Sequence, residues 1–60
     1  MAATFELYQD AGKDWRWRLR HTNGRIIAES GEGYEAKVDA KNGIESVKVD
    51  APRAPVVESR

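Results

Sequence analysis

The 60-residue chain has no cysteine, only two prolines and a single histidine. Without cysteine it forms neither disulfides nor thiolate metal sites, and His21 alone cannot build a metal site. A chain this short hides only about 60% of the surface that its unfolded form exposes, so small domains often need a disulfide, a metal or a second subunit. Oligomerisation is therefore the expected source of added stability, although domains near this size also fold as monomers.

The chain also lacks net charge and long apolar runs. Its ten basic and ten acidic residues cancel, so no overall field draws it toward nucleic acid or a membrane. No apolar segment approaches the roughly 20 residues of a membrane span. The first residues have neither the basic nor the apolar region of a signal peptide, which makes the cytoplasm the expected location. The sequence predicts one folded domain over residues 1–60.

The clearest pattern is a run of six residues, 15–20, in which apolar and cationic side chains alternate. Successive side chains of a β-strand point to opposite faces, so this pattern predicts a strand over residues 15–21 with one apolar and one charged face. The apolar face comprises Trp15, Trp17 and Leu19. The cationic face comprises Arg16, Arg18 and Arg20.

Shorter alternating segments flank this strand on both sides. Residues 4–9 alternate in the same way, and residues 10–14 form a turn cluster in which Gly12 is available for a positive φ. Asn23-Gly24, before residues 25–30, is a strong hairpin signal and predicts a type I′ turn with positive φ at both positions. The sequence therefore predicts a three-stranded antiparallel meander.

The two turns imply registers that agree on the faces of this sheet. The Asn-Gly turn places His21 opposite Ile26, and the first turn places Gln9 opposite Trp15. The predicted apolar face comprises Phe5, Leu7, Trp15, Trp17, Leu19, Ile26 and Ala28. The other face carries a cross-strand row of opposite charges, with about 0.2–1 kcal/mol per pair. This row comprises Glu6, Arg18 and Glu29.

A helix is predicted after the sheet breaks at Gly31-Glu32-Gly33. From Asp39, the predicted N-cap, apolar residues recur at helical spacing until Pro52 ends the helix. Gly43 in the middle of this helix costs about 1 kcal/mol relative to alanine. We therefore expect another backbone or a large ring such as a tryptophan to lie against it. The helix is expected to pack on the tryptophan face.

The C-terminal tail has strand character because Pro55, Val56 and Val57 combine an edge-compatible proline with two β-branched residues. A short apolar strand needs an edge to pair with. The tail can return to its own sheet, or it can add to the sheet of a neighbour, which is the physical basis of strand exchange.

Several motifs between Phe5 and Lys48 carry a resemblance that covers the chain from Phe5 to Val57. They are Phe5-Glu6-Leu7-Tyr8, Trp15-Arg16-Trp17-Arg18-Leu19, Asn23-Gly24, Ile26-Ile27-Ala28, Gly33-Tyr34, Lys37 and Lys41-Asn42-Gly43-Ile44-Glu45-Ser46-Val47-Lys48. Together they resemble the YegP-like family of small proteins of uncharacterised function. The resemblance implies an α+β domain with the element order β-β-β-α-β, present once or in tandem. It implies that single-unit members form a homodimer with one shared sheet and exchanged C-terminal strands, at Pro55, Val56 and Val57 here. It implies no reaction and no ligand.

The arginines of the charged face, Arg16, Arg18 and Arg20, are candidates for contact with nucleic acid or another partner. Basic grooves hold phosphates and aromatic rings stack bases. However, the alternation puts the tryptophans on the opposite face and the net charge is zero, so we favour core rings and solvated, paired arginines. Further candidate contacts are Tyr34, Lys37 and Lys41. Tyr34 either anchors the connector to the core or lines a groove beside it.

No constellation for catalysis, metal or cofactor binding is recognisable. His21 has no spaced partner for general base catalysis, and Asp10 with Asp14 falls short of a calcium loop. Gly31-Glu32-Gly33 lacks the third glycine of a dinucleotide fingerprint and is treated as a hinge. The sequence therefore predicts a homodimeric binding or interaction module without catalytic activity or cofactor, and no membrane partner. The alternative is a nucleic-acid-binding protein. A site built from two chains would not be visible in one sequence.

Overall fold

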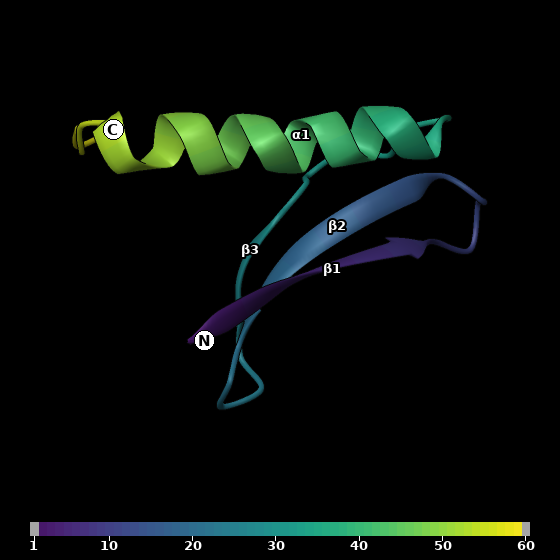
Figure 1. Cartoon of the computed structure of the whole chain (residues 1–60), viewed down its shortest axis with the longest axis horizontal. Helices are drawn as coiled ribbons and strands as arrows, with labels where there is room; N and C mark the ends of the chain where they lie inside the picture. The colour runs from purple at the N-terminus through teal and green to yellow at the C-terminus, as the bar shows by residue number, and fades with distance from the viewer. Residues whose placement is uncertain (1, 60) are drawn as a thin grey trace.

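The computed structural model describes residues 2–59 and has an α+β fold. Its strands are β1 (Ala3–Gln9), β2 (Trp15–His21) and β3 (Ile26–Glu29), followed by helix α1 (Lys37–Asp50) and a single 3₁₀ turn, η1 (Ala51–Arg53). The strands form one antiparallel sheet in the order β1-β2-β3, and α1 lies across one face of it (Figure 1). The predicted meander and helix are confirmed. No helix of the described residues has the length and apolar character needed to cross a membrane.

The pairing of β1 with β2 follows the predicted register. Gln9 lies opposite Trp15, and Glu6 lies opposite Arg18. The turn between these strands differs in one detail, because the positive φ falls on Lys13, at 69°, and not on Gly12. The side chain of Gln9 donates a hydrogen bond to the Lys13 carbonyl (3.1 Å), which helps to hold that conformation.

The turn between β2 and β3 is not the predicted type I′ turn. Gly24 has a positive φ of 90°, but Asn23 does not. The Gly24 N–H donates to the His21 carbonyl (2.9 Å), and the His21 N–H donates to the Arg25 carbonyl (2.8 Å). Thr22 and Asn23 are therefore the central residues, and Gly24 takes the left-handed position of a three-residue hairpin loop. The Asn23 side chain stabilises the loop by accepting the Arg25 N–H at 2.9 Å.

This longer loop shifts the start of β3 by one residue. Ile26 lies opposite Arg20 and not opposite His21. The prediction that Ile26 joins the apolar face was wrong, because residues directly opposite each other share a face and Arg20 lies on the charged one. Ile26 is accordingly 47% exposed.

A β-bulge restores the predicted register farther along β3. The pairing shifts between Leu19 and Arg20, so that Ala28 still lies opposite Leu19 and Glu29 lies opposite Arg18. Ile27 is the extra residue of the bulged strand. The one-residue error at the turn is cancelled here, and the predicted charged row remains correct.

The sequence predicted that the sheet ends at Gly31-Glu32-Gly33. In the structure, pairing with β2 resumes after this connector. Tyr34 and Trp15 exchange two backbone hydrogen bonds of 2.8 and 2.7 Å. The segment between Ser30 and Tyr34 therefore loops out of the sheet and returns to it. The return needs glycine at position 33, because a Cβ there would lie 2.6 Å from the Cβ of Asp14.

The core lies between the sheet and α1, and its buried residues are Trp17, Ala40 and Ile44. Partly buried side chains surround it: Phe5, Leu7, Trp15, Ala28, Tyr34 and Val47. A Cβ added at Gly43 would lie 2.9 Å from the Tyr34 hydroxyl and 3.1 Å from Trp17 Nε1. This confirms the expectation that a large ring lies against this glycine.

Helix α1 begins two residues before the predicted N-cap. Ala36 is the N-cap, with an extended backbone and no side-chain cap hydrogen bond, and Asp39 lies in the first turn. There its carboxylate still faces the positive end of the helix dipole. The earlier start has a tertiary cause, since the bridge between Tyr34 and Trp15 fixes where the chain leaves the sheet. Pro52 lies in η1, directly after the end of α1.

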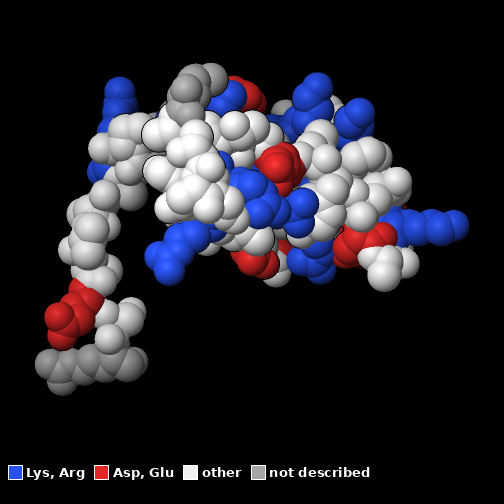
Figure 2. All heavy atoms as spheres, turned by 90° about the horizontal axis from the view of Figure 1, so that it is seen from below, with Lys and Arg blue, Asp and Glu red and all other residues white. Residues whose placement is uncertain are grey.

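The tail forms no strand within the described part of the single chain. Residues 54–59 have no regular structure, and Val56 and Val57 are 99% and 78% exposed. The C-terminal segment extends away from the body of the molecule (Figure 2). The final strand that the resemblance implies is therefore not formed by the described residues of the single chain.

Candidate functional site

The candidate site is the sheet face turned away from α1, which we call the outer face. Figure 2 looks onto this side of the molecule, where basic and acidic groups lie next to each other. Its residues come from all three strands because alternate side chains of each strand share a face. The outer face comprises Thr4, Glu6, Tyr8, Arg16, Arg18, Arg20, Ile26 and Glu29, with Asp10 at its end.

Two of the three arginines share one carboxylate. The Nε atoms of Arg18 and Arg20 lie 2.7 and 3.0 Å from Glu6 Oε1. These two hydrogen bonds hold the pKa of the Glu6 carboxyl below its ordinary value, and the one from Arg18 has the larger effect. The Arg18 guanidinium also stacks over the ring of Tyr8 at 4.5 Å from its centroid, and Arg20 donates to the Gly24 carbonyl at 2.8 Å.

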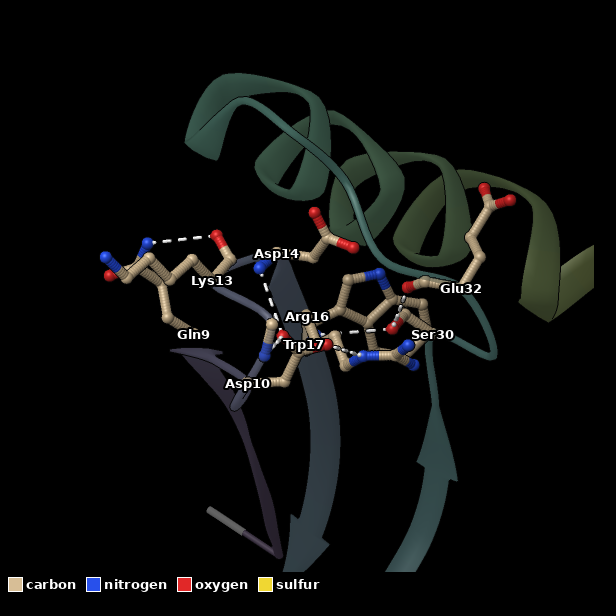
Figure 3. A network of polar contacts seen from close by, with 9 residues as sticks. Gln9, Asp10, Lys13, Asp14, Arg16, Trp17, Ser30 and Glu32 are labelled. Atoms are coloured by element: carbon tan, nitrogen blue, oxygen red, sulfur yellow. Dashed lines mark hydrogen bonds and ion pairs between the residues drawn. The ribbon is translucent and has the colours of Figure 1, made fainter.

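The third arginine pairs with a turn residue. Arg16 Nε lies 2.5 Å from Asp10 Oδ2, while the other oxygen of Asp10 accepts the N–H groups of Gly12 (2.9 Å) and Asp14 (3.0 Å) (Figure 3). The pKa of the Asp10 carboxyl is lowered, chiefly by Arg16. Asp10 thus closes the turn between β1 and β2 and anchors Arg16.

Sequence reasoning missed this pairing and treated Asp10 only as a turn residue. A signal was present, because an Asp two residues before a Gly often accepts the backbone N–H of that Gly in an Asx turn. The register then brings the turn next to Arg16, which lies one residue beyond the Gln9–Trp15 pair. What the sequence does not indicate is that Arg16 reaches past Tyr8, its directly opposite neighbour.

The outer face is therefore a mixed-charge surface and not a uniformly basic one. The side chains of Arg16, Arg18 and Arg20 are only 32–34% exposed, and all three lean toward carboxylates of β1 and its turn. Such ordered guanidiniums can donate hydrogen bonds to a partner surface that carries its own acceptors. A nucleic-acid surface more often has clustered, unbalanced basic residues.

The other three candidate residues do not join this face. Tyr34 anchors the connector, with its backbone bridged to Trp15 and its hydroxyl next to Gly43. The Lys37 ammonium lies 5.3 Å from the ring centroid of Trp15, and Lys41 is exposed on α1. Since α1 covers the inner face, these lysines and the arginines lie on opposite sides of the sheet.

His21 has a local structural contact in the turn. Its Nδ1 atom accepts the Asn23 N–H at 3.2 Å. Within residues 2–59, no three His, Asp or Glu side chains are grouped so that they could hold a metal ion.

Comparison with known proteins identifies relatives over nearly the whole chain. A family model described as a domain of unknown function, DUF1508, matches residues 10–58. A UPF0339 protein of Treponema denticola is 50% identical over 97% of this chain and 98% of its own length. One of Stutzerimonas stutzeri is 48% identical over 87% of this chain but only 46% of its own length. The NMR structure of a Haloferax volcanii protein is similar in fold, with a TM-score of 0.91, 58% identity and 95% coverage of both chains.

Proposed function

This chain belongs to the DUF1508 family of uncharacterised proteins, also called UPF0339 or YegP-like, and on that premise we propose that it is a homodimeric binding module rather than an enzyme. The proposal has two parts. The first is the pairing of two copies through exchanged C-terminal strands. The second is a binding role for the outer face of the resulting sheet.

The main observation in support of the proposed dimer is the conformation of the C-terminal tail. Val56 is 99% exposed in the single chain, although valine is among the residues that most favour half-buried strands. Pro55 and Val57 complete a short segment suited to the edge of a sheet. Addition of this segment to the sheet of a second copy would pair its backbone and bury its apolar side chains.

The incompletely covered inner face gives independent support. Only three side chains in residues 2–59 form the buried core, and Phe5, Leu7 and Trp15 beside them remain partly exposed. A chain of this size gains stability when a second subunit covers such surface. The length of the Stutzerimonas stutzeri relative is compatible with two units in one chain, the arrangement that a dimer would mimic.

Sedimentation equilibrium at micromolar concentration tests the dimer directly. We expect the mass of two chains for the full-length protein. Removal of residues 54–60 should give a monomer or an unfolded chain, since the exchanged strand is lost. A monomeric mass for the intact protein would rule the dimer out.

The binding role is supported by the ordered outer face, where Arg16, Arg18 and Arg20 are held by Glu6 and Asp10. Pre-ordered side chains lose less conformational freedom on binding. Purification of the native protein with its bound partners, followed by mapping of amide chemical shifts, is the appropriate test. Shifts confined to α1 would contradict a role for the outer face.

Nucleic-acid binding remains the alternative proposal and has less support. Its motivation is the row of three arginines, and the ion pairs with Glu6 and Asp10 argue against it. If it is correct, affinity for single-stranded DNA or RNA should fall steeply with salt, and the double variant Arg16→Ala/Arg20→Ala should bind more weakly. Absence of binding at low salt would eliminate it.

The cytoplasmic location also stays a prediction, which cell fractionation can check.

A further inference from the structure

We propose that Asn23 is a site of spontaneous deamidation in the folded protein, whereas α1 protects Asn42 from the same reaction. The chain has only these two asparagines, and each is followed by a glycine, Gly24 or Gly43. A following glycine favours the reaction because no side chain obstructs the attack of its backbone nitrogen. The two sites share the same local chemistry, so the fold makes the difference between them. Nothing in this reaction requires the proposed dimer.

Deamidation needs only water as a co-reactant. The Gly24 nitrogen attacks Asn23 Cγ, the bond from Cγ to Nδ2 breaks, and the side-chain nitrogen leaves as ammonia with the proton of the Gly24 N–H. Water then opens the resulting cyclic succinimide at either of its carbonyl carbons. The product is aspartate or isoaspartate, and in isoaspartate the main chain runs through Cγ and is longer by a methylene group.

The loop between β2 and β3 leaves Asn23 open to this reaction. Thr22, Asn23 and Gly24 are all exposed, and apart from its chain neighbours no atom of residues 2–59 lies within 4 Å of the position of a Gly24 Cβ. The Arg25 N–H donates to Asn23 Oδ1 at 2.9 Å, and negative charge develops on this oxygen as the ring closes. The attacking Gly24 N–H donates to the His21 carbonyl at 2.9 Å, so local opening of an exposed loop frees it.

Helix α1 holds Asn42 and Gly43 in a conformation that cannot react. Asn42 is exposed, so the difference lies in the backbone and not in access to water. Both residues lie in the helix interior, where each N–H donates to the carbonyl four residues earlier. A Gly43 Cβ would also lie 2.9 Å from the Tyr34 hydroxyl and 3.1 Å from Trp17 Nε1. Ring closure at Asn42 therefore requires the helix and its packing on the core to open.

Deamidation of Asn23 would reach the outer face through Arg20. Arg20 Nη1 donates to the Gly24 carbonyl at 2.8 Å, next to the peptide bond that is modified. Aspartate at position 23 leaves this backbone unaltered, and its carboxylate can still accept the Arg25 N–H. Isoaspartate lengthens the main chain directly before Gly24 and so displaces the carbonyl that helps to hold Arg20.

Peptide mapping tests the two asparagines separately. Trypsin, which cleaves after lysine and arginine, releases Asn23 in peptide 21–25 and Asn42 in peptide 42–48. The intact protein is incubated at neutral pH with and without guanidinium chloride, and mass spectrometry follows the acid form of each peptide against an unincubated sample. In the folded protein Asn23 should react at least about tenfold faster than Asn42, because loops open with far lower free energies than core helices. In guanidinium chloride the two rates should be comparable.

Equal rates at the two sites of the folded protein would overturn the proposal. So would a folded protein that stays unmodified at Asn23 while the denatured chain reacts at both sites. Asn23→Gln is the control, because ring closure from the longer side chain is much slower, and it should abolish the acid form of peptide 21–25. Persistence of that form at the wild-type rate would refute cyclisation at Asn23.

Nitrogen-15 NMR tests the consequence for Arg20. Asn23→Asp carries the new charge on an unaltered backbone, and the isoaspartate form is purified from aged protein by chromatography. The isoaspartate form should shift the amide signals of residues 20–26 and the Nε signal of Arg20, whereas Asn23→Asp should leave that Nε signal close to its wild-type position. An Arg20 Nε signal that is the same in the isoaspartate form and the wild type would overturn the link to the outer face.

Discussion

The two faces of β2 are specified by the same alternation but are held by different forces. On the inner face Trp17 is 6% exposed and packs edge-to-face on Phe5, with ring centroids 5.7 Å apart. On the outer face the side chain of Arg18 is 32% exposed and is held by Glu6. The inner partners follow from position in the sheet. The outer partners depend on how far a long side chain can reach.

This difference is clearest where outer side chains bond to residues that are not directly opposite them on the neighbouring strand. Arg20 lies opposite Thr4 but bonds to Glu6, and Arg16 bonds to Asp10. Burial of a large ring contributes several kcal/mol, whereas exposed ion pairs contribute about 0–1 kcal/mol. We therefore expect the inner face to govern stability and the outer face to modulate it.

The largest expected effect comes from Trp17→Ala. Loss of a buried aromatic side chain costs about 3–5 kcal/mol, against a total of roughly 3–9 kcal/mol for a domain of 60 residues. The variant should be largely unfolded by circular dichroism at 25 °C. Arg18→Ala, the next residue on the opposite face, is the control and should retain a cooperative melt close to that of the wild type. Equal losses in the two variants would refute the contrast between the faces.

Gly43→Ala should have an intermediate effect and should destabilise the protein, although helix propensity alone favours alanine. Alanine favours a helix interior by about 1 kcal/mol over glycine, but its Cβ would lie 2.9 Å from the Tyr34 hydroxyl and 3.1 Å from Trp17 Nε1. Overpacking of this kind costs about 1–3 kcal/mol, so urea denaturation should show net destabilisation.

Two companions make the Gly43 result specific. Ser46→Ala, at an exposed position of the same helix, should be neutral or slightly stabilising. Tyr34→Phe combined with Gly43→Ala should recover part of the loss, because the nearest clashing atom is removed. A Gly43→Ala variant more stable than the wild type would show that the rings move aside at little cost.

The smallest effect is expected from the outer face and depends on pH. The pKa of the Glu6 carboxyl is lowered in the folded protein by Arg18 and then Arg20. Its contribution to stability is therefore present above the ordinary glutamate pKa and is lost as the pH falls through the lowered one. The melting temperature of Glu6→Gln should fall less steeply between neutral and acidic pH than that of the wild type. Parallel curves would mean that this ion pair adds nothing measurable.

Prediction from sequence succeeded where a residue pattern allowed one arrangement and failed where it allowed two. The bounds of β2, the pairing of Glu6 with Arg18 and the ring against Gly43 were all predicted correctly. The conformation of Asn23 and the facing of Ile26 were not. A two-residue and a three-residue loop share the same Asn-Gly signal, and only the hydrogen bonds of the folded hairpin distinguish them.

The sequence by itself determined the two-faced character of β2, since a period of two leaves no choice about which side chains share a side. It also determined the helical segment, through apolar residues that recur at helical spacing. Only the tertiary structure decided that the bulge falls at Ile27, that Arg16 reaches Asp10 and that α1 begins at Lys37. Each of these depends on contacts that exist only in the folded chain, so local propensity does not select among the alternatives.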